Sequence, residues 1–243
     1  MSTVSGPRAA VGVVLAAGMG SRVGADGNKA YLRLAGASML SWSVRAVAET
    51  AGIDRVILVY RRGERDVAAR ALHEDLPGIA VELVEGGESR HDSEFNVLGH
   101  LCADIESGAV DVVLIHDAAR PLAGPDLMRT ALDTARAYGG AVPALPASGL
   151  ARPLPDGGLE PLTGRLVRVQ TPQAFRAGPL LEAYRRAEAQ GFDGTDTSAC
   201  VQHFTDVEVR VFGGAASNLK VTYPPDIRLA EHLLAATVNA DRR

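Results

Sequence analysis

The fold of this chain is decided near its beginning, where the apolar run Val11-Gly12-Val13-Val14-Leu15 opens into Ala16-Ala17-Gly18-Met19-Gly20-Ser21-Arg22. The run predicts a buried strand, and the small residues after it predict a loop with uncovered backbone N–H groups. Arg22 and Lys29 add positive charge. Because N–H groups and cations together bind phosphate oxygens, the stretch predicts a nucleoside triphosphate site.

The spacing of the glycines excludes the two commonest phosphate-binding motifs. The chain has no Gly-x-x-x-x-Gly-Lys-Ser/Thr, and Gly18-x-Gly20 is not followed by a glycine three residues later. A plain turn between a strand and a helix would explain the two glycines. It would not explain Arg22 and Lys29.

Composition limits the class of protein. The chain has 243 residues, of which 47% are hydrophobic, and a formal charge of −4, so we expect one domain over residues 1–243. Its scattered basic residues argue against a nucleic-acid or membrane partner. Cys102 and Cys200 have no paired spacing, and no apolar run reaches the roughly 20 residues of a membrane span. We therefore expect a cytoplasmic protein.

Short β-branched runs alternate with segments whose apolar residues recur every three to four positions. The expected strands are 11–15, 55–60, 79–84, 110–115 and 141–145, and the expected helices are 38–51, 64–76, 89–105 and 125–138. This alternation predicts an α/β fold with a largely parallel sheet and helices on both faces. Ligands in such sheets bind beyond the carboxyl ends of the strands.

The second half of the chain begins with a break in this pattern. Residues 146–164 are rich in Pro, Gly, Ser and Leu, and we interpret them as a protruding hairpin arm. The chain then returns with expected strands at 166–170 and 207–212, and with expected helices at 179–189, after Thr195 and at 225–237.

Two motifs follow expected strands. Gly86-Gly87-Glu88-Ser89-Arg90-His91-Asp92-Ser93 can be a capped helix start, although two glycines and Arg90 favour nucleotide contact. In His116-Asp117-Ala118-Ala119-Arg120-Pro121, Asp117 would project at the carboxyl edge of the sheet, where it can hold Mg²⁺ or orient a hydroxyl. A structural Asp-Arg turn is the alternative, and His116 is expected to be a core residue.

Two more motifs lie near the end of the chain. Residues 170–175 are expected to be a strand exit with hydroxyl and amide groups. In Ser217-Asn218-Leu219-Lys220-Val221-Thr222, Lys220 is expected on a short strand. If its two apolar neighbours face the core, Lys220 points to the site or to solvent, and the spacing leaves both open.

Six motifs in order resemble the 2-C-methyl-D-erythritol 4-phosphate cytidylyltransferases of the non-mevalonate isoprenoid pathway. They are LAAGMGSR (15–22), NKAYL (28–32), GGESRHDS (86–93), HDAARP (116–121), TPQ (171–173) and NLKVT (218–222). The resemblance implies transfer of CMP from CTP to a polyol phosphate, with release of pyrophosphate and with Mg²⁺. It also implies a Rossmann-like fold of the nucleotidyltransferase type and a homodimer that exchanges its arms, residues 146–165.

The resemblance also implies site residues. The catalytic cations are Arg22, Lys29 and Lys220. The nucleotide side comprises Ala16, Ala17, Gly18, Gly20, Gly87, Glu88, Arg90, Ser93 and Ala118. The acceptor side comprises Asp117, Arg120, Thr171 and Thr195, and Asp117 is also the candidate metal ligand.

The arm departs from the family pattern. Gly149-Leu150 and Arg152 stand where the family has an Asp-Thr pair and Lys, and Thr163 stands where it has Arg. The resemblance implies that these positions contact the acceptor, so ribitol 5-phosphate is the alternative acceptor. A non-catalytic nucleotide-binding paralogue is the alternative of another class. The retained charged groups of the nucleotide side favour an enzyme.

Overall fold

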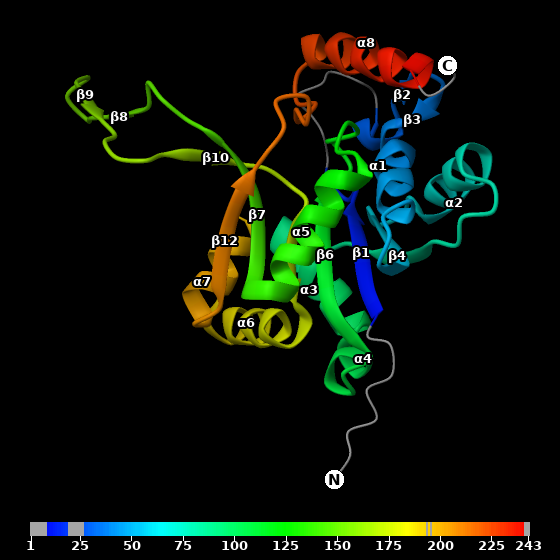
Figure 1. The fold of residues 1–243 in the computed structure, drawn as a ribbon, viewed down its shortest axis with the longest axis horizontal. Helices are drawn as coiled ribbons and strands as arrows, with labels where there is room; N and C mark the ends of the chain where they lie inside the picture. The colour runs from blue at the N-terminus through cyan, green and yellow to red at the C-terminus, as the bar shows by residue number, and fades with distance from the viewer. Residues whose placement is uncertain (1–8, 19–26, 193, 195, 241–243) are drawn as a thin grey trace.

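The computed structural model describes residues 9–18, 27–192, 194 and 196–240, without the side chains of 237–240. Its described residues form a central sheet of eight strands, with the order β10-β7-β11-β6-β1-β4-β5 and with β12 on the other edge of β7 (Figure 1). The strands are β1 (Ala9–Leu15), β4 (Ile53–Tyr60), β5 (Glu82–Glu85), β6 (Val110–Asp117), β7 (Gly139–Pro146), β10 (Val167–Val169), β11 (Gln173–Arg176) and β12 (Glu208–Gly213).

Only β10 and β11 run antiparallel to the neighbours they pair with in this sheet. The expected α/β fold with a mostly parallel sheet is therefore confirmed. No helix within the described ranges is long and apolar enough to cross a membrane.

Helices cover both faces of the sheet. One face packs against α1 (Met39–Ala48), α2 (Arg65–Asp75) and α5 (Pro125–Tyr138). The other packs against α3 (Arg90–His100), α4 (Cys102–Glu106), α6 (Ala177–Gln190) and α7 (Thr197–Phe204). The last helix, α8 (Pro224–Ala240), lies over the small hairpin of β2 (Arg33–Leu34) and β3 (Ala37–Ser38).

Alternation along the strands builds the two cores. On β1, Val14 packs on the α1 side and Val13 on the α3 side, and both are fully buried. Gly12 lies on the α1 side, where an added Cβ would stand 2.2 Å from Val47. The absence of a side chain there lets α1 approach β1 closely.

The expected hairpin arm is confirmed. Strands β8 (Ala151–Pro153) and β9 (Leu159–Pro161) pair in antiparallel register, with Arg152 opposite Glu160, and project far from the body of the molecule (Figure 1). The two side chains form an ion pair of 3.4 Å across the hairpin. The arm is therefore an ordered hairpin on an extended stem.

Three expectations about elements were wrong. The helix expected over 89–105 is divided, because α3 ends at His100 and α4 begins at Cys102. Residues 173–176 form β11, inserted between β6 and β7, although a strand exit was expected. Lys220 lies in an irregular segment rather than a strand. The positions of β11 and Lys220 depend on partners distant in sequence, which local patterns do not contain.

Candidate active site

A cavity of about 320 Å³ lies at the carboxyl ends of β1 and β6, where the parallel topology predicts a ligand site. Eight of the nine residues expected on the nucleotide side line it, together with Asp117 and the two lysines that were expected to be catalytic, Lys29 and Lys220. The eight are Ala16, Ala17, Gly18, Gly87, Glu88, Arg90, Ser93 and Ala118. The expected Gly20, Arg22 and Thr195 lie outside the described residues.

Asn28 links the two segments that form the first wall of the cavity, the end of β1 and the turn at Lys29. Its side-chain amide donates to the Ala16 carbonyl at 2.8 Å and to the Glu64 carboxylate at 2.9 Å, and its oxygen caps the short 3-10 turn Lys29–Tyr31. Asn28 is buried. The amide therefore fixes the start of the Lys29 segment against the end of β1.

The second wall is the turn before α3. Ser89 and Asp92 form a capping box, which confirms the capped helix start. Ser93 accepts a hydrogen bond from the Gly87 N–H at 3.1 Å and donates one to the Ser89 carbonyl at 2.8 Å. An added Cβ on Gly87 would stand 2.2 Å from the Cβ of Asp92. The glycine is thus required by the close packing of the turn on its own helix.

Asp117, the last residue of β6, is the electrostatic centre of the site. Its side chain is 8% exposed, and its carboxylate pairs with Arg90 and, at 2.8 Å, with Lys220. Arg120 lies farther away, at 3.9 Å. Burial alone would raise the pKa of the Asp117 carboxyl, but Arg90 and Lys220 outweigh it and hold that pKa well below its usual range. Asp117 is therefore an anion that fixes two cations beside the cavity.

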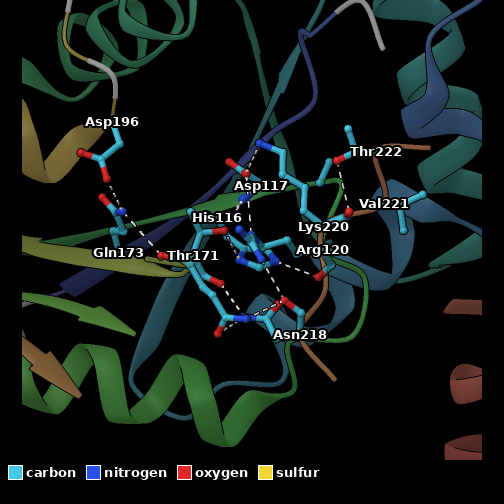
Figure 2. A network of polar contacts seen from close by, with 12 residues as sticks. His116, Asp117, Arg120, Thr171, Gln173, Asp196, Asn218, Lys220, Val221 and Thr222 are labelled. Carbon is cyan, nitrogen blue, oxygen red and sulfur yellow. Dashed lines mark hydrogen bonds and ion pairs between the residues drawn. The ribbon is translucent and has the colours of Figure 1, made fainter. Parts of the chain in front are cut away.

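A hydrogen-bonded chain supports Asp117 from below (Figure 2). The Thr171 hydroxyl accepts from the Asp117 backbone N–H at 3.0 Å and lies 3.1 Å from Nδ1 of His116. His116 Nε2 lies 3.1 Å from the Arg120 carbonyl. Burial is the main cause that lowers the pKa of His116 to about 4, so it is neutral at pH 7. This fits the Nε2–H tautomer, and the expectation of a core histidine is confirmed.

The C-terminal segment 218–222 completes the site. The fully buried Asn218 donates to the Thr171 carbonyl at 2.8 Å, and its own carbonyl accepts from Arg120 at 2.8 Å (Figure 2). The backbone N–H of Val221 donates a hydrogen bond to the Ala119 carbonyl. The Val221 carbonyl accepts one from Lys29 Nζ at 2.9 Å. These contacts turn Lys220 toward Asp117, which resolves the alternative that its spacing left open.

The sequence contains only two lysines, Lys29 and Lys220, and both line this cavity. All its other permanent cations are arginines. An ammonium is a compact charge with three donors, which suits a phosphate oxygen approached from more than one side. The distribution of the two lysines sets this cavity apart from the rest of the chain.

Two residues expected on the acceptor side do not line the cavity. Thr171 is buried behind Asp117, and Arg120 spans from Asp117 to the Asn218 carbonyl. Their acceptor contacts stay predictions. Sequence reasoning missed Asn28, Glu64 and Asn218 as supports of the site, although Asn28 and Asn218 belong to the quoted motifs.

Magnesium would find few protein ligands here. Within the described residues there is no group of three or more His, Cys, Asp or Glu side chains that could hold a metal ion. The cavity offers the carboxylates of Glu88 and Asp117. Because Mg²⁺ is commonly bound by one or two carboxylates, substrate phosphates and water, this donor set fits an ion carried by a nucleotide.

Comparison with known proteins identifies the family. The family model described as 2-C-methyl-D-erythritol 4-phosphate cytidylyltransferase matches residues 10–236. Curated proteins of that name from Cereibacter sphaeroides and Solibacter usitatus are 40% and 33% identical over 229 and 238 residues. These matches cover 92% of this chain in both cases, and 96% and 95% of the relatives.

Solved structures agree in fold. The 4-diphosphocytidyl-2C-methyl-D-erythritol synthase of Anaerococcus prevotii is similar with a TM-score of 0.80 and 26% identity, over 94% of this chain and 97% of that one. The 2-C-methyl-D-erythritol 4-phosphate cytidylyltransferase of Thermus thermophilus has a TM-score of 0.71 and 29% identity, over 92% and 98%. The chain belongs to the 2-C-methyl-D-erythritol 4-phosphate cytidylyltransferase family.

Proposed function

We propose that this protein transfers CMP from CTP to 2-C-methyl-D-erythritol 4-phosphate and releases pyrophosphate, a step of isoprenoid biosynthesis. Membership of the family supports the substrates. The observation that carries the proposal is the cavity in which Lys29, Lys220 and Asp117 meet beside the small-residue turns. This arrangement provides close approach for a triphosphate and positive charge on two sides of it.

In the proposed reaction, a phosphate oxygen of the acceptor attacks the α-phosphorus of CTP in line. A new P–O bond forms there, the bond to the β-phosphate oxygen breaks, and pyrophosphate leaves. The acceptor phosphate is already ionised at neutral pH, so the protein needs no general base. Its main tasks are to bring two anions together and to stabilise charge in the transition state.

The residues divide these tasks. Lys29 and Lys220 hold the α-phosphate from two sides, and the turns at Ala16–Gly18 and Gly87-Glu88 accept the nucleotide. Asp117 holds Lys220 in place. Glu88 and Asp117 would hold Mg²⁺ together with the triphosphate, and the ion would supply positive charge for the leaving pyrophosphate.

We also propose that two copies of the chain pair through the arm, residues 146–165. Support comes from its apolar surface: Leu150, Leu154 and Leu159 are 47%, 38% and 71% exposed on a thin projection. Apolar residues gathered on an exposed hairpin mark an interaction site. We place the reaction in the cytoplasm, because Cys102 and Cys200 are both free.

The test is pyrophosphate release with CTP and Mg²⁺, with methylerythritol 4-phosphate and ribitol 5-phosphate offered in parallel. We expect release with methylerythritol 4-phosphate and loss of that release in Lys29→Ala. Release with ribitol 5-phosphate alone would assign the departures at Leu150 and Thr163 to a different acceptor. Binding of CTP without release for either acceptor would favour a non-catalytic paralogue.

A further inference from the structure

Glu94, on the second turn of α3, is a buried carboxylate that the reaction above does not use. Its side chain is 1% exposed. It accepts hydrogen bonds from the Thr197 hydroxyl at 2.8 Å and from the Tyr184 hydroxyl, and it lies 2.9 Å from Nε of Arg90. Helices α3, α6 and α7 therefore meet at this one carboxylate.

Arg90 connects Glu94 to the site. Arg90 lines the cavity, whereas Glu94 does not. The Nη1 of Arg90 pairs with Asp117. The Nε of Arg90 forms an ion pair with Glu94, although the Nε–H is not aligned for a hydrogen bond. Its Nη2 is buried and has no hydrogen-bond partner within the described residues. Two nitrogens of the guanidinium are thus engaged by carboxylates, and the third is left with a donor to satisfy.

The burial of Glu94 is costly without these partners. A carboxylate at this depth loses its hydration, which raises the pKa of Glu94, while Arg90, Tyr184 and Thr197 oppose that shift. An apolar side chain would pack between the three helices without this cost. Charge at this position is therefore explained by the guanidinium that it faces rather than by packing.

We propose that Glu94 is a positioning residue, which holds Arg90 in the orientation that keeps its guanidinium and the Asp117 carboxylate in place at the wall of the nucleotide cavity. A planar guanidinium held at two nitrogens by two carboxylates has a fixed orientation, so the cavity wall that Arg90 and Asp117 form is preorganised before the ligand binds. The inference rests on the proposed function, because the ligand is taken to be CTP.

The experiment measures the dissociation constant of CTP by calorimetry in wild type and in Glu94→Gln, which keeps the size of the side chain and removes its charge. We expect binding about 10-fold weaker, within the range of coupling between residues in one network. When Glu94→Gln is added to the Arg90→Ala variant, the dissociation constant of CTP should change by no more than about 2-fold. KM for CTP should rise more than kcat falls. If Glu94 had a purely structural role, Glu94→Gln would weaken CTP binding by the same factor in wild type and in Arg90→Ala.

Controls separate folding from positioning. Glu182→Gln, in an exposed ion pair with Arg186 on α6, should leave CTP binding unchanged. Thr197→Val keeps the Glu94 charge and removes one of its donors, so it carries the test if Glu94→Gln does not fold. Wild type that binds no CTP would contradict the proposed function. Wild-type binding that Glu94→Gln leaves unchanged, or equal losses with and without Arg90, would overturn the role of Glu94 alone.

Discussion

The ammonium of Lys220 lies 2.8 Å from the carboxylate of Asp117, which also pairs with Arg90. Lys220 comes from an irregular segment near the C-terminus, and Asp117 ends a central strand. A flexible side chain that is 43% exposed is thereby held at one wall of the cavity. The fold thus holds the charge of Lys220, which we propose to be catalytic, at the cavity.

Lys220→Ala should lower kcat by on the order of 100-fold, because loss of one preorganised donor costs about 3 kcal/mol in the transition state. The measurement is pyrophosphate release at saturating CTP and acceptor. Lys220→Arg should recover part of the rate, since it restores the charge. Equal rates in wild type and Lys220→Ala would remove Lys220 from the mechanism.

Amine-selective acetylation should inactivate the protein at two side chains only. Lys29 and Lys220 are its only lysines, and both line the cavity. Apart from the N-terminus, the reagent therefore modifies only amines of the site. We expect CTP to slow the loss of activity, and peptide mass spectrometry should locate the modification. Full activity after acetylation of both lysines would contradict their proposed role.

Gly87→Ala should weaken CTP binding by about 10-fold or more. Its new Cβ would meet the Asp92 Cβ at 2.2 Å, so the turn that lines the cavity must shift. The matched control is Gly99→Ala on α3, the helix that follows this turn, where an added Cβ has no neighbour within 4 Å. Calorimetric titration with CTP compares the three proteins. If Gly87→Ala and Gly99→Ala bound CTP equally well, the Gly87 turn would not be part of the CTP site.

Stability should fall between pH 6.5 and pH 4 because of His116. In this window the unfolded chain binds a proton at His116, whereas the folded chain, with a pKa of about 4, does not. The full effect is about 3 kcal/mol, lost as the pH drops and complete below about pH 4. Urea unfolding from pH 5 to 7 should give a flatter pH dependence in His116→Gln.

The exposed His73 provides the control for this experiment. His73→Gln removes an exposed imidazole instead of a buried one and should keep the pH dependence of wild type, so the comparison isolates the effect of burial at His116. Other titrating groups, including the Glu94 carboxyl, are shared by all three proteins and cancel in the comparison. An unchanged slope in His116→Gln would show that His116 accepts a proton in the folded state.

Leu159→Glu should convert a dimer to a monomer in sedimentation velocity at micromolar concentration. Leu159 is 71% exposed on the arm, and a charge there would oppose burial in a partner. Val67→Glu places the same charge on α2, at a residue 47% exposed, and should leave the dimer intact. A wild-type monomer would contradict pairing through the arm.

Much of the site could be predicted because its residues lie in short local motifs at strand ends. Asp117 ends an apolar strand, and Gly87 precedes a capped helix, so both positions could be predicted from pattern and topology. Glu94 could not be found in this way. It lies just beyond that helix start, and its partners Tyr184 and Thr197 are 90 and 103 residues away.

The sequence by itself determined the alternation of strands and helices, the hairpin arm and the motifs of the nucleotide site, because these depend on periodicity and on adjacent residues. Only the tertiary structure decided that β11 enters the sheet beside β6 and that Lys220 faces Asp117. Both depend on contacts between segments far apart in the chain. Such contacts form when packing and charge pairing outweigh local preference, which no local pattern records.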